Sequence, residues 1–142
     1  MSEDCIRLEF DVDSENFASA GMASEAVKTK LKQLGINMQD VRRVAIAMYE
    51  GEINMVIHAK GGKATVDIFP HRVDMILADK GPGIADIDLA MKEGYSTAPD
   101  NIRALGFGAG MGLPNMKKNT DAMKIDSVQG IGTTIYMTVN LH

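Results

Sequence analysis

Glu50 and Asn54 stand four residues apart in a segment, residues 44–59, that is otherwise largely apolar. On a helix this spacing turns two side chains toward one face, about 40° apart. A carboxylate can take up a proton, and an amide oxygen can ligate a hard cation such as Mg²⁺. The pair could therefore supply a base and a cation ligand. Taken alone, the pair is better explained as the solvated edge of an amphipathic helix, because Glu-x-x-x-Asn is a common pattern.

An acidic residue followed by two glycines forms the second candidate, Asp79-x-Gly81-x-Gly83. Glycines at the end of a strand let a flat ring approach the backbone closely. A carboxylate is a natural acceptor for an exocyclic amine such as the adenine N6 group. A simple Asp-Gly-Pro-Gly turn explains these residues about equally well.

Four glycines then alternate ahead of an expected helix, at positions 106, 108, 110 and 112. Alternating glycines leave backbone N–H groups free to line an anion site, and a following helix adds its dipole. A flexible hinge explains one or two glycines but not four at regular spacing. Because no Gly-Lys-Ser/Thr follows, a P-loop is excluded. Further on, Gly132-Thr133 opens the last expected strand, where a hydroxyl could reach a base through water. On its own, this segment is better explained by β-branched residues in an ordinary strand.

Composition favours a soluble globular fold of one domain, residues 1–142, with 45% hydrophobic and 24% charged residues. The net charge of −4 gives no reason to expect nucleic acid or an anionic membrane surface as a partner. A single cysteine, Cys5, excludes an internal disulfide and fits a reducing compartment. Without a signal peptide or an apolar run of ~20 residues, we expect a cytoplasmic protein. No Cys/His set has zinc spacing.

Periodicity predicts the elements that must position these residues. Strands are expected at 5–12, 63–69, 73–78, 123–127 and 133–139, and helices at 23–34, about 37–60, 86–92 and 111–119. The stripe on the first helix is predicted to include Ala26 and Leu34. Residues 93–105 show no periodicity and are expected to form a lid. This order predicts an α/β, two-layer sandwich with helices on one face of a mixed sheet.

Taken together, the motifs resemble those of the GHKL ATPases, the group of gyrase, the Hsp90 chaperones, histidine kinases and MutL. Glu50-x-x-x-Asn54 is similar to the N box, residues 79–83 to the G1 box, residues 108–112 to the G2 box, and Gly132-Thr133 to a threonine turn near the adenine. This resemblance implies the Bergerat fold. A free-standing domain of this length resembles the bacterial anti-sigma-factor serine kinases, and in places their switch-kinase branch, which can activate a phosphatase directly.

The resemblance also implies roles for individual residues. Asn54 would ligate Mg²⁺ that bridges the phosphates of ATP or ADP, and Glu50 would orient or deprotonate the attacking hydroxyl. Asp79 would hold the adenine amine, Gly83 would let the ring approach, and Gly81 would be a further nucleotide-binding residue. Further nucleotide-binding residues implied in this way are Ile84, Gly108, Gly110, Met111, Gly112, Leu113 and Thr133.

Within that set, the glycines of residues 108–112 would cradle phosphates, and residues 94–107 would be the mobile ATP lid. The kinases often place an arginine near the end of the lid. Arg103 lies in that neighbourhood, but the longer glycine run leaves its register open. Lys117 and Lys118 could face the phosphates or the solvent, and solvent is the better prediction for at least one.

The function expected from the resemblance is a Mg²⁺-dependent protein serine/threonine kinase that phosphorylates a STAS-type anti-sigma antagonist. A sigma factor or a PP2C-type phosphatase would be a further partner, and a homodimer is compatible with the family. Two alternatives stay open at this point. One is a nucleotide-gated binding module with negligible catalysis, and the other is a detached histidine-kinase catalytic domain.

Overall fold

The computed structural model describes residues 5–12, 21–58, 62–80 and 112–142, and the side chains of 57, 58 and 112 are outside the description. The expected helix at 86–92 and the expected lid lie outside the described residues. The elements follow in the order β1 (Ile6–Val12), α1 (Met22–Gln33), α2 (Met38–His58), β2 (Gly62–Ile68), β3 (Arg72–Asp79), α5 (Gly112–Lys118), β4 (Ala122–Val128) and β5 (Gly132–Asn140).

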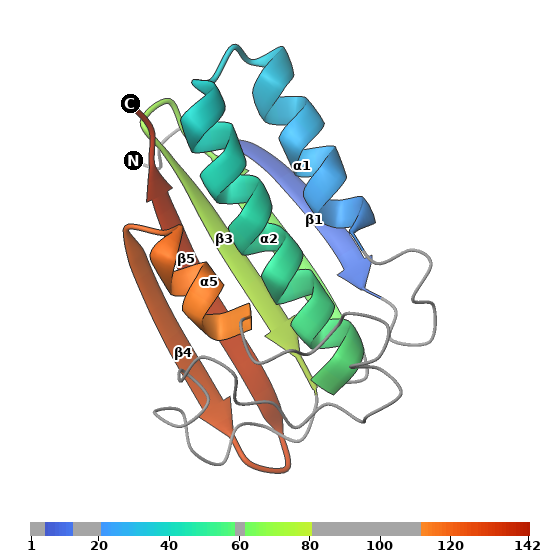
Figure 1. The fold of residues 1–142 in the computed structure, drawn as a ribbon. Helices are drawn as coiled ribbons and strands as arrows, with labels where there is room; N and C mark the ends of the chain where they lie inside the picture. Colours follow the sequence, from blue (N-terminus) through green and yellow to red (C-terminus); the bar gives the residue numbers. More distant parts are fainter. Residues whose placement is uncertain (1–4, 13–20, 59–61, 81–111) are drawn as a thin grey trace, which may run out of the picture.

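Five strands form one sheet in the order β1-β2-β3-β5-β4, and the three described helices cover one of its faces (Figure 1). The predicted two-layer sandwich is therefore confirmed. The prediction of a mixed sheet is wrong, because every described strand pair is antiparallel. Short turns make β2–β3 and β4–β5 hairpins. The antiparallel helices α1 and α2 return the chain to the end of the sheet where β1 finishes, so β2 runs back along β1.

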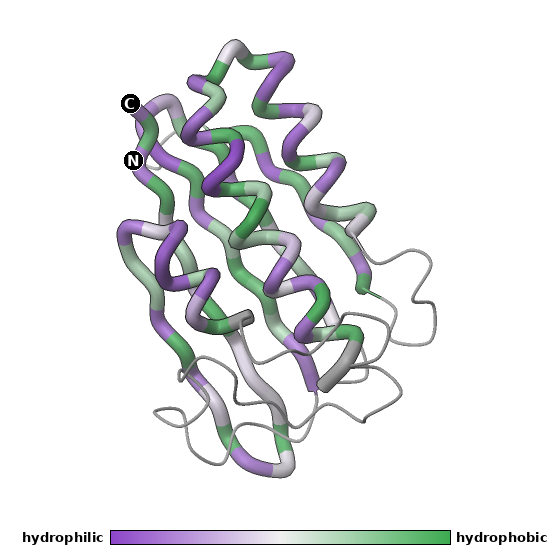
Figure 2. The backbone as a smooth tube through the Cα atoms, in the orientation of Figure 1, coloured by the Kyte–Doolittle hydropathy of each residue, from purple (hydrophilic) through white to green (hydrophobic). Residues whose placement is uncertain are grey.

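The core lies between the sheet and the helices. Figure 2 shows hydrophobic and hydrophilic residues alternating along α1 and α2. Burying one large apolar side chain, such as a leucine or a methionine, stabilises a fold by roughly 1.5–3 kcal/mol. The largest fully buried side chains are Leu31, Met48, Met75, Leu77, Met116, Met137, Val27, Val41, Val44, Val66, Val73 and Val139.

The apolar stripe predicted on α1 is too wide. Ala23, Val27 and Leu31 are buried, but Ala26 is exposed and Leu34 retains 42% of its accessible surface. The buried positions recur every four residues, because α1 meets its neighbours along one narrow ridge. Leu34 lies beyond the last turn of α1, where Gly35 adopts a φ of 74° and ends the helix.

Helix α2 begins after Asn37, whose side-chain Oδ1 accepts a hydrogen bond from the Gln39 backbone N–H at 2.8 Å. It ends at His58. The next described residue, Gly62, is the first residue of β2. No helix within the described ranges has the length and apolar character needed to cross a lipid bilayer.

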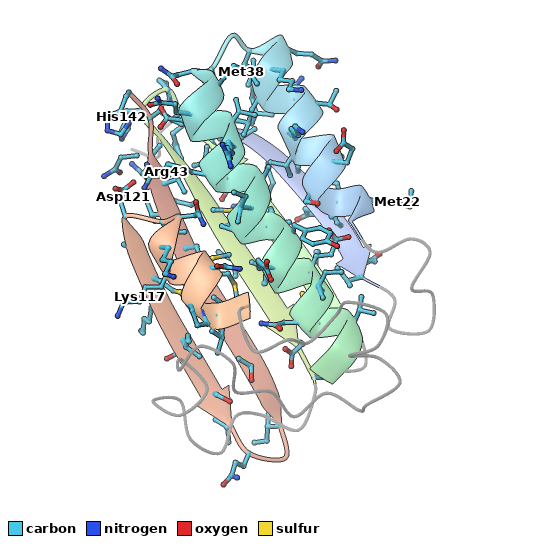
Figure 3. The ribbon with its side chains drawn as sticks, in the orientation of Figure 1. Met22, Met38, Arg43, Lys117, Asp121 and His142 are labelled. Carbon is cyan, nitrogen blue, oxygen red and sulfur yellow. The ribbon has the colours of Figure 1, made fainter. Side chains whose placement is uncertain are left out.

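The C-terminal residues pack against the start of α2. The His142 backbone N–H donates to Oδ2 of Asp40 at 2.7 Å, and Asp40 is 2% exposed. Figure 3 shows Arg43, Asp121 and His142 gathered at this end of the molecule. The Arg43 guanidinium lies 3.1 Å from Oδ2 of Asp121. The Asn140 backbone N–H, and then Arg43, hold the pKa of Asp121 below its usual range. Among the candidate site residues that the structure describes, Asp79 and Thr133 lie at the other end of the sheet.

Candidate functional site

Glu50 and Asn54 lie one turn apart on α2, and both are half-buried. The Glu50 carboxylate faces α5, where its Oε1 atom accepts a hydrogen bond from Nδ2 of Asn115 at 3.2 Å. The spacing of four places Asn54 on the same side of the helix. The structure therefore puts the predicted base and the predicted cation ligand together, beside the helix that follows the glycine run.

Glu52 has a different environment from Glu50, although only one residue separates them. Glu52 is 3% exposed, and it accepts hydrogen bonds from the backbone N–H groups of Ala23 at 3.2 Å and Ser24 at 3.1 Å. It thus points away from Glu50, toward α1. Of these two carboxylates, only Glu50 lies toward α5.

Asp79 is the last residue of β3 and is half-buried. Its Oδ1 atom accepts a hydrogen bond from the backbone N–H of Thr133 at 3.1 Å. Thr133 is 6% exposed, and its hydroxyl lies 2.9 Å from the hydroxyl of Ser127. The structure therefore joins Asp79 and Thr133 directly, through the main chain of Thr133 rather than its side chain.

Two glycines let neighbouring strands approach Asp79 closely. A Cβ atom on Gly132, whose φ is +154°, would collide with the Asp79 carbonyl oxygen. A Cβ atom on Gly62 would collide with the carbonyl oxygen of Ala78 and lie 2.9 Å from the Cα atom of Asp79. The end of β3 is therefore held between β2 and β5 at positions that only glycine fits without displacement.

A steric reason also explains why position 51 of α2 is a glycine. A Cβ atom there would lie 2.5 Å from Cδ2 of the buried Leu77 on β3. From the sequence, room for a nucleotide and a close helix contact explain this glycine equally well. The structure supports the close contact, since Gly51 lets α2 rest directly on the sheet. This contact fixes the height of Glu50 above the strands.

The remaining predicted site residues are described only in part. Gly112 opens α5, and Leu113 is 7% exposed, packed in the core. Lys117 and Lys118 are both exposed. Figure 1 shows that α2 and β3 end, and β5 and α5 begin, at the same end of the molecule. The predicted residues that lie outside the described residues are Gly81, Gly83, Ile84, Gly108, Gly110, Met111 and Arg103.

Sequence reasoning missed two polar residues of this region, Asn115 and the capping carboxylate Glu52. Their partners lie 65 and 28 positions away in the chain, so no local spacing marks them. The left-handed Gly21 at the start of α1 makes no side-chain cap. A helix start without a capping side chain was the one available signal that another residue must supply the acceptor.

Comparison with known proteins agrees with this architecture. The family described as "Histidine kinase-, DNA gyrase B-, and HSP90-like ATPase" matches residues 39–142. An anti-sigma F factor from Clostridium novyi is 31% identical over 99% of this chain and 97% of its own length. The serine/threonine-protein kinase RsbT of Bacillus subtilis is 30% identical over 94% of this chain and 92% of its own length.

Two solved structures share the fold. One contains RsbU and RsbW domains from Mycobacterium tuberculosis, with a TM-score of 0.65 and 17% identity over 96% of this chain and 32% of that one. The other is the mycobacterial sensor histidine kinase MprB, with a TM-score of 0.54 and 18% identity over 96% of this chain and 99% of that one.

The chain belongs to the histidine kinase-, DNA gyrase B- and HSP90-like ATPase family. Within that family, it has homologues of full length among the anti-sigma factors and the RsbT-type serine kinases. Membership implies that it binds ATP.

Proposed function

We propose that this chain is an ATP-dependent protein serine kinase that controls a transcription or stress-response switch. Its substrate would be a serine of a STAS-type antagonist protein, and its second partner a sigma factor or a PP2C-type phosphatase. The observation that carries the proposal is the likeness to an anti-sigma factor and to RsbT over nearly the whole of each chain. Such a kinase would act in the cytoplasm.

The roles proposed for the described residues follow from their chemistry. Asn54 offers a carboxamide oxygen, a ligand suited to Mg²⁺, one turn from Glu50. Mg²⁺ bound between Asn54 and the phosphates would neutralise part of their charge. Asp79, held by the Thr133 N–H, would accept a hydrogen bond from the adenine amine. The glycines at 81, 83, 108, 110 and 112, together with Ile84, Met111 and Leu113, would complete the nucleotide site, with 94–107 as its lid.

In the proposed reaction, the hydroxyl oxygen of the substrate serine attacks the γ-phosphorus of ATP, and Glu50 accepts the hydroxyl proton. A serine O–P bond forms, the bond between the γ-phosphorus and the β–γ bridging oxygen breaks, and ADP leaves. The placement of Glu50 supports this role. Glu50 is half-buried, and it is Glu52, not Glu50, that caps α1.

Isothermal titration with ADP and ATP, with and without Mg²⁺, tests the nucleotide site. We expect micromolar, Mg²⁺-assisted binding that Asp79→Asn weakens. Asp74→Asn is the matched control, because Asp74 lies on the same strand but its carboxylate bonds to Thr138 and Arg72. Absence of binding at millimolar nucleotide, or equal weakening by both substitutions, would contradict the proposed site.

Phosphate transfer to a STAS-type protein from the same genome tests the activity. We expect acid-stable phosphoserine on that protein, formed at only a small residual rate in Glu50→Ala and Asn54→Ala. Acid-labile phosphate on a histidine would instead identify a detached histidine-kinase domain. Nucleotide binding with no transfer, and partner affinity that differs between ATP and ADP, would identify a nucleotide-gated module.

A further inference from the structure

We infer that Asn115 on α5 is a positioning residue for Glu50, fixing the carboxylate in the orientation that phosphate transfer requires. The inference rests on the proposed function of Glu50 as the base. Its physical basis is the hydrogen bond of 3.2 Å from Nδ2 of Asn115 to Oε1 of Glu50, between half-buried residues 65 positions apart. Because an ionised carboxylate only accepts hydrogen bonds, the amide nitrogen is the atom that faces it.

The contact leaves one oxygen of Glu50 for chemistry. Among the residues that the structure describes, Oε1 has the Asn115 amide as its partner, whereas Oε2 has no hydrogen-bond partner. One fixed oxygen restricts rotation of the carboxylate about its last side-chain bond. The second oxygen then points in a defined direction, where it can receive the proton of an incoming hydroxyl.

A neutral amide is well suited to this task. A lysine or arginine in the place of Asn115 would also hold the carboxylate, but its charge would make Glu50 a weaker base. The carboxamide orients Glu50 and adds no net charge beside it. The two exposed lysines of α5, Lys117 and Lys118, follow in the next turn.

Helix packing does not require the hydrogen bond. The contact of α5 with the core is made by Met116, which is fully buried, and by Leu113, which is 7% exposed. Asn115 itself is held in place from its own helix, since Nδ2 of Asn119 donates to the Asn115 carbonyl oxygen at 2.8 Å. The Asn115 side chain, which is half-buried, directs its amide nitrogen to Glu50.

The test compares the single-turnover rate of phosphate transfer in wild type, Asn115→Ala, Asn115→Leu and Glu50→Ala. Asn115→Leu keeps the branched shape of the side chain and replaces its two polar atoms with methyl groups. We expect both Asn115 substitutions to lower the rate constant by on the order of 10-fold, with the ATP KM and the ADP Kd unchanged within about twofold. The matched control is Thr120→Val, which removes a hydrogen bond of 2.9 Å to the Met116 carbonyl within the same segment. It should transfer phosphate at the wild-type rate.

A double substitution separates positioning from a structural effect. If Asn115 acts through Glu50, then Asn115→Leu causes no further loss of rate in the Glu50→Ala background. Losses that multiply, or a KM that rises with the fall in rate, would overturn the inference and assign Asn115 to structure or to nucleotide binding. A wild-type rate in Asn115→Leu would overturn it and leave the proposed function standing. No transfer by wild type would contradict both the inference and the proposed kinase function. An unchanged rate in Glu50→Ala would contradict the inference and the proposed role of Glu50 as the base.

Discussion

The Glu52 carboxylate of α2 lies 3.1 Å from the backbone nitrogen of Ser24, so it caps the first turn of α1 from a different helix. The adjacent N–H of Ala23 donates to the other carboxylate oxygen at 3.2 Å. Helix starts leave backbone N–H groups without partners and carry partial positive charge. Gly21, which precedes α1, makes no side-chain cap. Glu52 thus ties the two helices together while Glu50 is left to face α5.

Glu52→Ala is expected to lower the free energy of unfolding by about 1–3 kcal/mol, because two buried N–H groups lose a charged acceptor. Glu52→Gln should cost less, since the amide oxygen still accepts one of the two bonds. Urea unfolding followed by circular dichroism measures both. Glu25→Gln is the control, an exposed acidic residue in the same helical turn, and should change stability by no more than about 0.5 kcal/mol. Equal effects of Glu52→Ala and Glu25→Gln would mean that the capping contact contributes nothing particular.

Gly51→Ala is expected to destabilise the protein, although alanine is the better helix former by about 1 kcal/mol. The new methyl group would lie 2.5 Å from Cδ2 of Leu77, and forcing extra volume into a packed core costs typically ~1–3 kcal/mol. Leu77→Ala removes the obstructing atoms. In that background Gly51→Ala should become neutral or stabilising, and this reversal of sign in urea unfolding is the measurement. A Gly51→Ala protein more stable than wild type would show that α2 does not need this close approach.

Local patterns predicted the described elements well. Apolar and polar residues alternate along the strands, because helices cover one face of the sheet, and each long helix carries an apolar stripe. The same patterns failed for features that depend on packing between segments far apart in the sequence. The direction of β1 relative to β2 depends on the helical pair between them, so the mixed sheet was a wrong prediction. The exposure of Leu34 depends on where α1 leaves its neighbours.

The candidate site divides in the same way. Glu50, Asn54 and Asp79 are marked by their own spacing or by the glycines beside them. Asn115 is recognised only when α5 packs on α2, and nothing in the segment Pro114 to Met116 signals a partner on another helix. Gly62 and Gly132 read as ordinary turn residues until the structure shows what a Cβ atom would meet.

The pair Arg7 and Asp67 should make stability depend on pH in a defined direction. The two residues face each other across β1 and β2, and Arg7 donates to both carboxylate oxygens at 2.7 and 2.9 Å. These hydrogen bonds lower the pKa of Asp67 below its usual value of 3.8. The stabilisation is therefore fully present above 3.8 and is lost as pH falls through the lower pKa of the folded state.

Asp67→Asn should accordingly be less stable than wild type at neutral pH, with a difference that shrinks as pH falls below 3.8. Chemical unfolding over a pH series measures this. Arg7→Gln should reproduce the loss at neutral pH, and the double substitution should lose little more than either single one. A difference between wild type and Asp67→Asn that stayed constant into acid would exclude the ion pair as its source.

Gly132 and Gly130 offer a matched comparison of two glycines in one hairpin. Gly130 has a φ of +80° and nothing within 4 Å of the place that a methyl group would occupy, whereas a methyl group on Gly132 would collide with the Asp79 carbonyl oxygen. Both alanine substitutions should cost stability, by roughly 1 kcal/mol for backbone strain at Gly130. Only Gly132→Ala should move the start of β5 away from the end of β3.

That displacement has a consequence for the proposed adenine site. The hydrogen bond from the Thr133 N–H to Oδ1 of Asp79 depends on the close approach of the two strands. Gly132→Ala should therefore weaken ADP binding by about tenfold or more, equivalent to one lost hydrogen bond to a charged group. Gly130→Ala should bind ADP as wild type does, because its strain stays in the turn. Titration of both variants below their unfolding temperatures gives the answer. Parallel losses of affinity would mean that the hairpin affects the site only through overall stability, whereas a loss confined to Gly132→Ala would place the nucleotide beside the Asp79–Thr133 contact.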